Sequence, residues 1–136
     1  MDIRTLDSEP ARREAVPLLR QLWPDRDPDE VLAWTGDDDY TLFGAFEGEN
    51  LVGVAGVLLS THLHHREQAW LYDLVVDDPR RGEGVGRTLV THVEDWAAAR
   101  GCDAVALASP LGKEGVHAFY ECQGYERWGY VLEREC

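Results

Sequence analysis

The stretch that decides the fold is YDLVVDDPRRGEGVGRTL, residues 72–89, in which a short apolar run leads through a glycine-rich turn into a helix-like pattern. Residues 72–76 are typical of a strand, and apolar side chains recur at helical spacing from Val85 onward. The start of a helix presents unpaired backbone N–H groups and a partial positive charge, which attract phosphate. Glycines let the backbone close around phosphate oxygens, and Arg81 and Arg87 add positive charge. The stretch therefore predicts an anion-binding turn.

Two common phosphate loops do not fit this turn. A P-loop requires Gly-x-x-x-x-Gly-Lys-Ser/Thr, which the chain lacks. A dinucleotide fingerprint requires Gly-x-Gly-x-x-Gly after the first strand of the fold, whereas Gly82, Gly84 and Gly86 alternate and come late in the chain. The spacing that remains is Arg-x-x-Gly-x-Gly, which runs from Arg81 to Gly86.

Outward from the turn, the chain reads as a series of short elements. Ser8 is suited to cap a first helix that carries Pro10 early and ends at Trp23. The predicted strands cover residues 3–6, 40–47, 51–60, 68–76 and 104–108, and residues 125–134 form either a final strand pair or one bent strand. The predicted helices cover residues 9–22, 28–35, 85–100 and 114–122. This order, β-α-α-β-β-β-α-β-α-β, predicts an α/β fold in one domain spanning residues 1–136, with a mixed sheet and helices on both faces.

Composition is typical of a folded intracellular protein. With 44% hydrophobic residues over 136 positions, the chain can bury one core, and it has no run of about 18 apolar residues that could span a membrane. The N-terminus lacks the basic and apolar regions of a secretory signal. Cys102, Cys122 and Cys136 are widely spaced and fit neither a disulfide framework nor a zinc site. We expect a cytoplasmic protein without a bound metal, and the sequence leaves a homodimer open.

The charge is strongly acidic. A formal net charge of −13 repels nucleic-acid phosphates and anionic lipids, so neither nucleic acid nor membrane is an expected partner. Two explanations of the charge stay open, namely adaptation to high salt in a halophilic source and attraction of a cationic substrate. Because acidic residues are spread along the whole chain, adaptation is the favoured explanation.

Two motifs together carry a resemblance to a known family. The first is Leu74-Val75-Val76-Asp77 followed by the Arg-x-x-Gly-x-Gly spacing, and the second is HAFYECQGY, residues 117–125. They resemble the acetyl-CoA motif and the Ala-x-x-Phe-Tyr-Glu-x-x-Gly-Phe pattern of the GCN5-related N-acetyltransferase (GNAT) family. The resemblance covers most of the chain and implies a GNAT-like, mostly antiparallel mixed sheet of six to seven strands. It also implies transfer of the acetyl group of acetyl-CoA to a primary amine by direct attack in a ternary complex.

The resemblance further implies where acetyl-CoA binds. The strand backbone would hold the pantetheine arm in a gap where residues 68–76 splay from residues 104–108, and an N–H near Val76 would stabilise the oxyanion. The turn and the start of the following helix would hold the pyrophosphate. Lys113 stands where the family often has asparagine, so it departs from the family pattern, although it could reach a phosphate. The implied cofactor-binding residues are Leu74, Val75, Val76, Arg81, Gly82, Glu83, Gly84, Val85, Gly86, Arg87 and Lys113.

Catalytic roles follow from the same resemblance. Tyr120 takes the place of the family's general acid, which protonates the leaving sulfur. Asp73 and His117 are candidates for the general base, because Asp73 lies on the cofactor strand and His117 precedes Tyr120 by one helical turn. Water relayed to a carboxylate is a further alternative.

The acceptor, a small-molecule or protein amine, is expected to meet the N-terminal helices, the C-terminal strand and a histidine loop. That loop contains His62, His64 and His65, which lack the further ligands of a metal site. A non-catalytic acetyl-CoA sensor or interaction module is the alternative function. The turn would bind acetyl-CoA in an enzyme and in a sensor alike, and only the enzyme needs Tyr120. Aromatic candidates for lining the acceptor site are Trp23, Trp34, Tyr40, Trp70, Trp128 and Tyr130.

Overall fold

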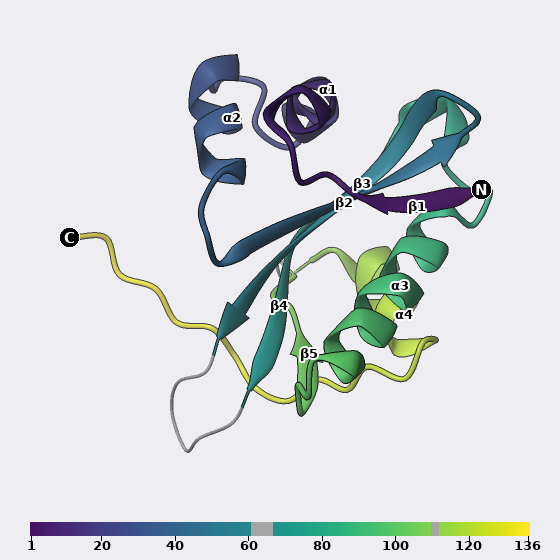
Figure 1. The fold of residues 1–136 in the computed structure, drawn as a ribbon. Helices are drawn as coiled ribbons and strands as arrows, with labels where there is room; N and C mark the ends of the chain where they lie inside the picture. The colour runs from purple at the N-terminus through teal and green to yellow at the C-terminus, as the bar shows by residue number, and fades with distance from the viewer. Residues whose placement is uncertain (61–66, 110–111) are drawn as a thin grey trace. The chain divides into compact units, whose positions relative to one another are not determined.

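The computed structural model describes residues 1–60, 67–109 and 112–136, which divide into two compact units, residues 1–106 and residues 107–136. A single domain over both units stays a prediction. No helix within the described ranges is long and apolar enough to cross a membrane. The second unit contains α4 (Glu114–Glu121) (Figure 1). The first contains β1 (Asp2–Thr5), α1 (Glu9–Leu19), α2 (Pro28–Thr35), β2 (Tyr40–Glu47), β3 (Asn50–Ser60), β4 (Gln68–Val76), the short 3₁₀ helix η1 (Asp78–Arg80), α3 (Val85–Ala99) and β5 (Ala104–Ala106).

The first unit is built on a five-stranded sheet in the order β1-β2-β3-β4-β5. Strands β1 to β4 pair antiparallel, and β5 joins β4 in parallel. The turn signal after β2 makes the β2–β3 hairpin, in which Glu47 pairs with Asn50. The mixed, mostly antiparallel sheet is confirmed, but the predicted count of six to seven strands is wrong for the described residues.

The predicted final strand accounts for that difference. Residues 125–134 form no regular secondary structure. An alternating pattern makes a stable strand when a neighbouring strand supplies hydrogen bonds and one face is buried. Trp128 and Leu132 are 93% and 91% exposed, so this segment does not bury a face.

Element boundaries largely follow local sequence signals. The bounds predicted for β2 and β4 are confirmed, and Ser8 Oγ caps α1 by accepting a backbone N–H at 3.3 Å. Helix α1 ends at Leu19, before the predicted end at Trp23. The reason is that the Gln21 N–H bonds to the Leu18 carbonyl three residues back, which tightens the chain into a 3₁₀-type turn.

Helices cover both faces of the sheet, as predicted, with α1 and α2 on one face and α3 on the other (Figure 1). Leu42 and Phe43 are neighbours on β2 and point to opposite faces, since side chains alternate along a strand. Leu42 joins a buried cluster with residues of α1 and α2, whereas Phe43 meets Trp96 of α3 edge to face at a ring-centroid distance of 5.3 Å. Each fully buried large apolar side chain contributes about 1.5–3 kcal/mol, so the two layers hold the central strands firmly.

Candidate active site

Strand β5 is much shorter than β4 and pairs only with the first three residues of β4. Their pairing starts at Gln68 with Ala104 and ends at Trp70 with Ala106. Beyond Trp70, β4 continues to Val76 with β3 on one side, and no described strand pairs with its other side. Free backbone N–H and C=O groups along such an edge can bind an extended ligand as an added strand. The predicted splay of residues 68–76 from residues 104–108 stays a prediction, because β5 ends at Ala106 and residues 107 and 108 belong to the second unit.

The turn after β4 contains two glycines with left-handed backbone. Gly82 has φ +84° and Gly84 has φ +85°, a region that other residues rarely adopt. A Cβ placed on either residue would meet no atom within 4 Å. Glycine is therefore needed here for its backbone conformation, and the space beside both residues is open to a ligand.

Helix α3 begins after Gly84 without a side chain to cap it. Its first turn contains no acidic residue, and the Thr88 N–H makes the first helical bond, to the Gly84 carbonyl at 3.0 Å. The N–H groups of Val85, Gly86 and Arg87 therefore precede the first intrahelical bond and carry the helix's partial positive charge. This arrangement suits a phosphate group.

The two arginines of the motif have different surroundings. Arg81 donates from Nε to the Val76 carbonyl at 3.1 Å, and its Nη1 lies 2.9 Å from Asp78 Oδ1. Arg81 thus ties the turn to the end of β4. Arg87 is exposed on the first turn of α3. A phosphate contact by either arginine stays a prediction.

A residue that the sequence did not reveal connects the turn to the end of α1. Gln21 donates from Nε2 to Asp77 Oδ1 at 3.4 Å and accepts from Arg81 Nη2 at 3.3 Å. Asp77 in turn caps η1 by accepting the Asp78 N–H at 3.1 Å. Because these partners lie 56 and 60 positions away from Gln21, no local pattern could have indicated the contact.

Asp73 lies on β4 and points to the face covered by α1 and α2. Val75, two residues further along the strand, belongs to the cluster on that face. Asp73 is 6% exposed, its Oδ2 accepts from the Tyr40 hydroxyl at 2.6 Å, and its Oδ1 has no hydrogen-bond partner in the part of the chain that the structure describes. Burial raises the pKa of Asp73, and the bond from Tyr40 opposes part of that rise. A carboxylate with a raised pKa is a stronger base, which suits the predicted role.

The second unit carries the other predicted catalytic residues. Tyr120 of α4 packs edge to face with two aromatic rings at centroid distances of 5.0 and 5.5 Å, and burial raises its pKa to about 12. The phenol therefore keeps its proton at neutral pH, and burial also makes it a weaker acid than an exposed tyrosine. On the same helix, His117 Nδ1 lies 3.6 Å from Glu114 Oε2, and Lys113 is the N-cap. The catalytic roles of Tyr120 and His117 stay predictions.

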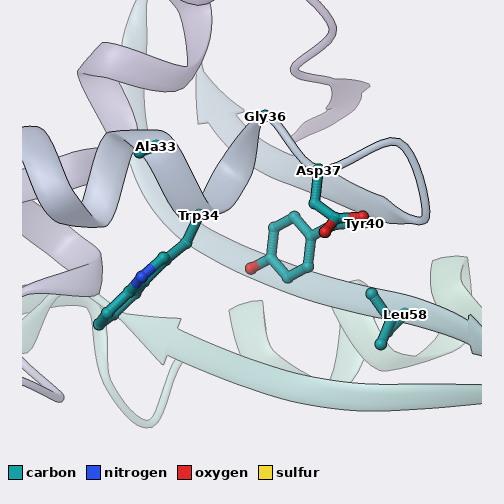
Figure 2. Close-up of a pocket in the computed structure, with 6 residues that line it drawn as sticks. All are labelled: Ala33, Trp34, Gly36, Asp37, Tyr40 and Leu58. Carbon is teal, nitrogen blue, oxygen red and sulfur yellow. The ribbon is translucent and has the colours of Figure 1, made fainter.

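A pocket of about 430 Å³ opens beside the end of α2 (Figure 2). Two of the predicted acceptor aromatics, Trp34 and Tyr40, line it, and Trp23 stands edge-on to Trp34 at a centroid distance of 5.7 Å. Trp128 and Tyr130 are exposed in the second unit. The histidine loop at residues 61–65 lies outside the described residues, and within the described ranges no group of three His, Cys, Asp or Glu residues could hold a metal ion.

Comparison with known proteins agrees with this architecture. The profile of the acetyltransferase (GNAT) family matches residues 5–125. The "uncharacterized N-acetyltransferase YhdJ" of Bacillus subtilis (strain 168) is 28% identical over 135 residues, covering 96% of this chain and 92% of its own length. The aminoalkylphosphonate N-acetyltransferase of Salmonella typhimurium is 29% identical over 86 residues, which are 61% of this chain and 54% of that protein.

A solved structure gives the same answer for the fold. The aminoglycoside N-acetyltransferase AAC(6')-Iy in complex with CoA superposes with a TM-score of 0.88 at 21% identity, covering 99% of this chain and 93% of that one. Because the family profile spans both motifs and the sheet that positions the turn, the chain belongs to the acetyltransferase (GNAT) family.

Proposed function

We propose that the chain is an N-acetyltransferase that transfers the acetyl group of acetyl-CoA to a primary amine. The observation that carries this proposal is the continuity of two features. The open side of β4 leads, through the short helix η1, into the glycine turn at the start of α3. An extended polar edge followed by an anion site matches a ligand whose polar arm ends in a pyrophosphate.

The residues present fit such a ligand. The backbone of Leu74, Val75 and Val76 would hold the pantetheine arm by strand-like hydrogen bonds. The backbone N–H groups from Gly82 to Arg87 would hold the pyrophosphate, since a Cβ at Gly82 or Gly84 would project into open space and α3 has no side-chain cap. Gln21 positions this turn through Arg81 and is a supporting residue.

The reaction requires the chain to manage two protons, while acetyl-CoA supplies the acetyl thioester. An alkylamine has a pKa near 10.4, so a base must take a proton before the nitrogen attacks the carbonyl carbon. Asp73 is the candidate base in the first unit, with His117 or a relayed water as alternatives. As the C–N bond forms and the C–S bond breaks, Tyr120 donates its phenolic proton to the departing sulfur.

The names of the relatives support an amine acceptor. One relative is named for aminoalkylphosphonates and one structural neighbour for aminoglycosides, and both names describe small molecules with amino groups. We therefore place a small-molecule amine ahead of a protein amine as the acceptor of this chain.

The deciding experiment measures thiol release from acetyl-CoA across a panel of primary amines. Tyr120→Phe is the test variant. Tyr130→Phe is the matched control because it removes the hydroxyl of an 83% exposed tyrosine of the same unit and keeps the aromatic ring by which Tyr130 would line an acceptor site. Loss of a general acid should lower kcat by about 10²-fold in Tyr120→Phe. We expect no change of kcat in Tyr130→Phe and no change of the acetyl-CoA dissociation constant in either variant.

Three other outcomes would contradict parts of this proposal. Firm acetyl-CoA binding without thiol release from any amine would make the chain a sensor. A lack of acetyl-CoA binding in equilibrium dialysis would overturn the proposal altogether. Equal kcat in both tyrosine variants would remove Tyr120 from the mechanism while leaving the transfer in place.

A further inference from the structure

Among the described residues, the pocket beside α2 combines aromatic walls with one charged side chain. Its lining residues are Ala33, Trp34, Gly36, Asp37, Tyr40 and Leu58. Figure 2 shows the side chains of Asp37, Tyr40 and Trp34, which all line the pocket, with the Tyr40 ring between the other two in this view. The volume of about 430 Å³ falls within the range of small-molecule sites, roughly 300–1,000 Å³. The walls therefore suit a small ligand that has an apolar or aromatic body and one positive charge.

Local contacts hold the charged and aromatic walls in position. Asp37 Oδ1 accepts the Asp39 N–H at 2.9 Å, which fixes the carboxylate and leaves its other oxygen for a ligand. The Arg26 guanidinium lies 5.8 Å from the centroid of the Trp34 ring. Arg26 therefore occupies part of this indole, and a ligand ammonium would use the part of the ring that faces the pocket.

A second carboxylate lies behind the Tyr40 wall. The Tyr40 hydroxyl donates to the buried Asp73 at 2.6 Å. Gly56 of β3 makes room for this bond, because a Cβ there would overlap the Tyr40 hydroxyl. One hydrogen-bonded pair therefore reaches from the pocket wall to β4, the strand on which we place acetyl-CoA.

We propose that this pocket is the acceptor site and that the acceptor is an arylalkylamine, bound as its ammonium form by Asp37 and the rings of Trp34 and Tyr40. The inference rests on the proposed function and names its substrate class. It departs from the acceptors that the relatives' names give. A phosphonate would meet Asp37 with like charge, and a polyhydroxylated sugar would leave hydroxyls unpaired against Ala33 and Leu58.

The test is a calorimetric titration of 2-phenylethylamine into the full chain saturated with CoA, a state in which no transfer takes place. Asp37→Asn is the test variant, because asparagine keeps the oxygen that accepts the Asp39 N–H. Asp38→Asn is the matched control, because it removes the same charge from an exposed neighbour outside the pocket lining. An exposed ion pair contributes modestly, so we expect about fivefold weaker binding in Asp37→Asn and no change in Asp38→Asn.

A second pair of variants tests the aromatic wall. Trp34→Ala removes the cation–π partner and should weaken 2-phenylethylamine binding about tenfold. Leu22→Ala is the control, since Leu22 is a large apolar side chain that is 43% exposed and lies outside the pocket lining, and it should leave binding unchanged. The uncharged analogue 2-phenylethanol should bind the parent chain and Asp37→Asn equally, and glucosamine should bind the parent more weakly than 2-phenylethylamine does.

The outcomes separate this inference from the proposed function. Equal weakening by Asp37→Asn and Asp38→Asn, or glucosamine binding as tight as that of 2-phenylethylamine, would overturn the pocket assignment. If Asp37→Asn releases thiol from acetyl-CoA with an unchanged amine KM, the assignment of the pocket as the acceptor site would be overturned, and the proposed acetyl transfer would be supported. If amine binding depends on Asp37 but no amine causes thiol release, the proposed acetyl transfer would be overturned, and the assignment of the pocket as an ammonium-binding site would be supported.

Discussion

Glycine serves opposite purposes in two regions of the first unit. In the turn after β4, Gly82 and Gly84 have left-handed backbone, and a Cβ on either would meet no atom within 4 Å. In β3, Gly53 and Gly56 have strand backbone, but a Cβ would be blocked. At Gly53 it would come within 2.9 Å of the Val85 side chain, and at Gly56 it would overlap the Tyr40 hydroxyl.

The two regions need glycine for different reasons. In β3, neighbouring side chains leave no space for a Cβ, whereas in the turn the backbone conformation requires glycine and the space beside it is open. The β3 glycines let α3 and the Tyr40 side chain lie close against β3, so substitution there acts on folding. The turn glycines leave a space that no atom of the described residues fills, which is where we propose that a phosphate binds. Substitution in the turn should therefore act on ligand binding beyond its effect on folding.

The largest effect is expected at Gly56. Gly56→Ala would force the Tyr40 hydroxyl away from Asp73 and leave a buried carboxylate without its donor. Overpacking together with an unsatisfied buried group should lower the free energy of unfolding by about 3 kcal/mol. Urea denaturation measures this loss, with Gly129→Ala as the control because a Cβ there meets open space. Equal stability of the two variants would show that β3 tolerates a side chain at Gly56.

The next effect is expected at Gly84, where strain and not collision opposes a side chain. Gly84→Ala places a Cβ residue at φ +85°, which should cost about 1–2 kcal/mol of folding stability. Gly115→Ala is the matched control, since Gly115 also has open space around it but no left-handed φ, and it should be neutral or slightly stabilising.

A companion substitution at Gly84 separates strain from ligand contact. Asparagine tolerates left-handed backbone, so Gly84→Asn should recover part of the stability that Gly84→Ala loses. Its side chain would nevertheless occupy the open space, so acetyl-CoA affinity should stay low. Parent-like acetyl-CoA affinity in Gly84→Asn would show that this space is not used by the ligand, and the contrast between the two regions would then concern backbone conformation alone.

The sequence predicted those features that depend on near neighbours in the chain. The Ser8 cap, the bounds of β2 and β4 and the start of α3 after Gly84 all follow from patterns a few residues long. The prediction failed at residues 125–134, because alternation does not supply a partner strand. It also missed the Tyr40–Asp73 bond, whose partners are 33 positions apart and meet only when the sheet forms.

A smaller effect is expected at Gln21, which supports the turn from outside it. Gln21→Ala removes exposed hydrogen bonds to Asp77 and Arg81, so folding stability should fall by only about 0.5 kcal/mol. Acetyl-CoA affinity, measured by equilibrium dialysis, should fall about threefold because the turn loses a tether. When Gln21→Ala is added to the Arg81→Ala variant, the further loss of acetyl-CoA affinity should be smaller than the loss that Gln21→Ala causes in the parent chain. Fully additive losses would mean that Gln21 acts on the turn by another route.

The smallest effect at acidic pH, where Asp73 is protonated, is expected for Asp73→Asn, because asparagine keeps an oxygen that can accept the Tyr40 hydroxyl. The informative quantity is the difference in unfolding free energy between variant and parent, measured by urea denaturation from pH 4 to neutral. Burial raises the pKa of Asp73 in the folded state, so the folded chain binds more protons than the unfolded chain between the two pKa values. The parent therefore loses stability from this group as pH rises through that window, and the variant does not.

Stability of Asp73→Asn should rise relative to the parent toward neutral pH. The opposite slope would mean that the bond from Tyr40 outweighs burial and lowers the pKa, which would make Asp73 a weaker base and favour His117 or water in its place.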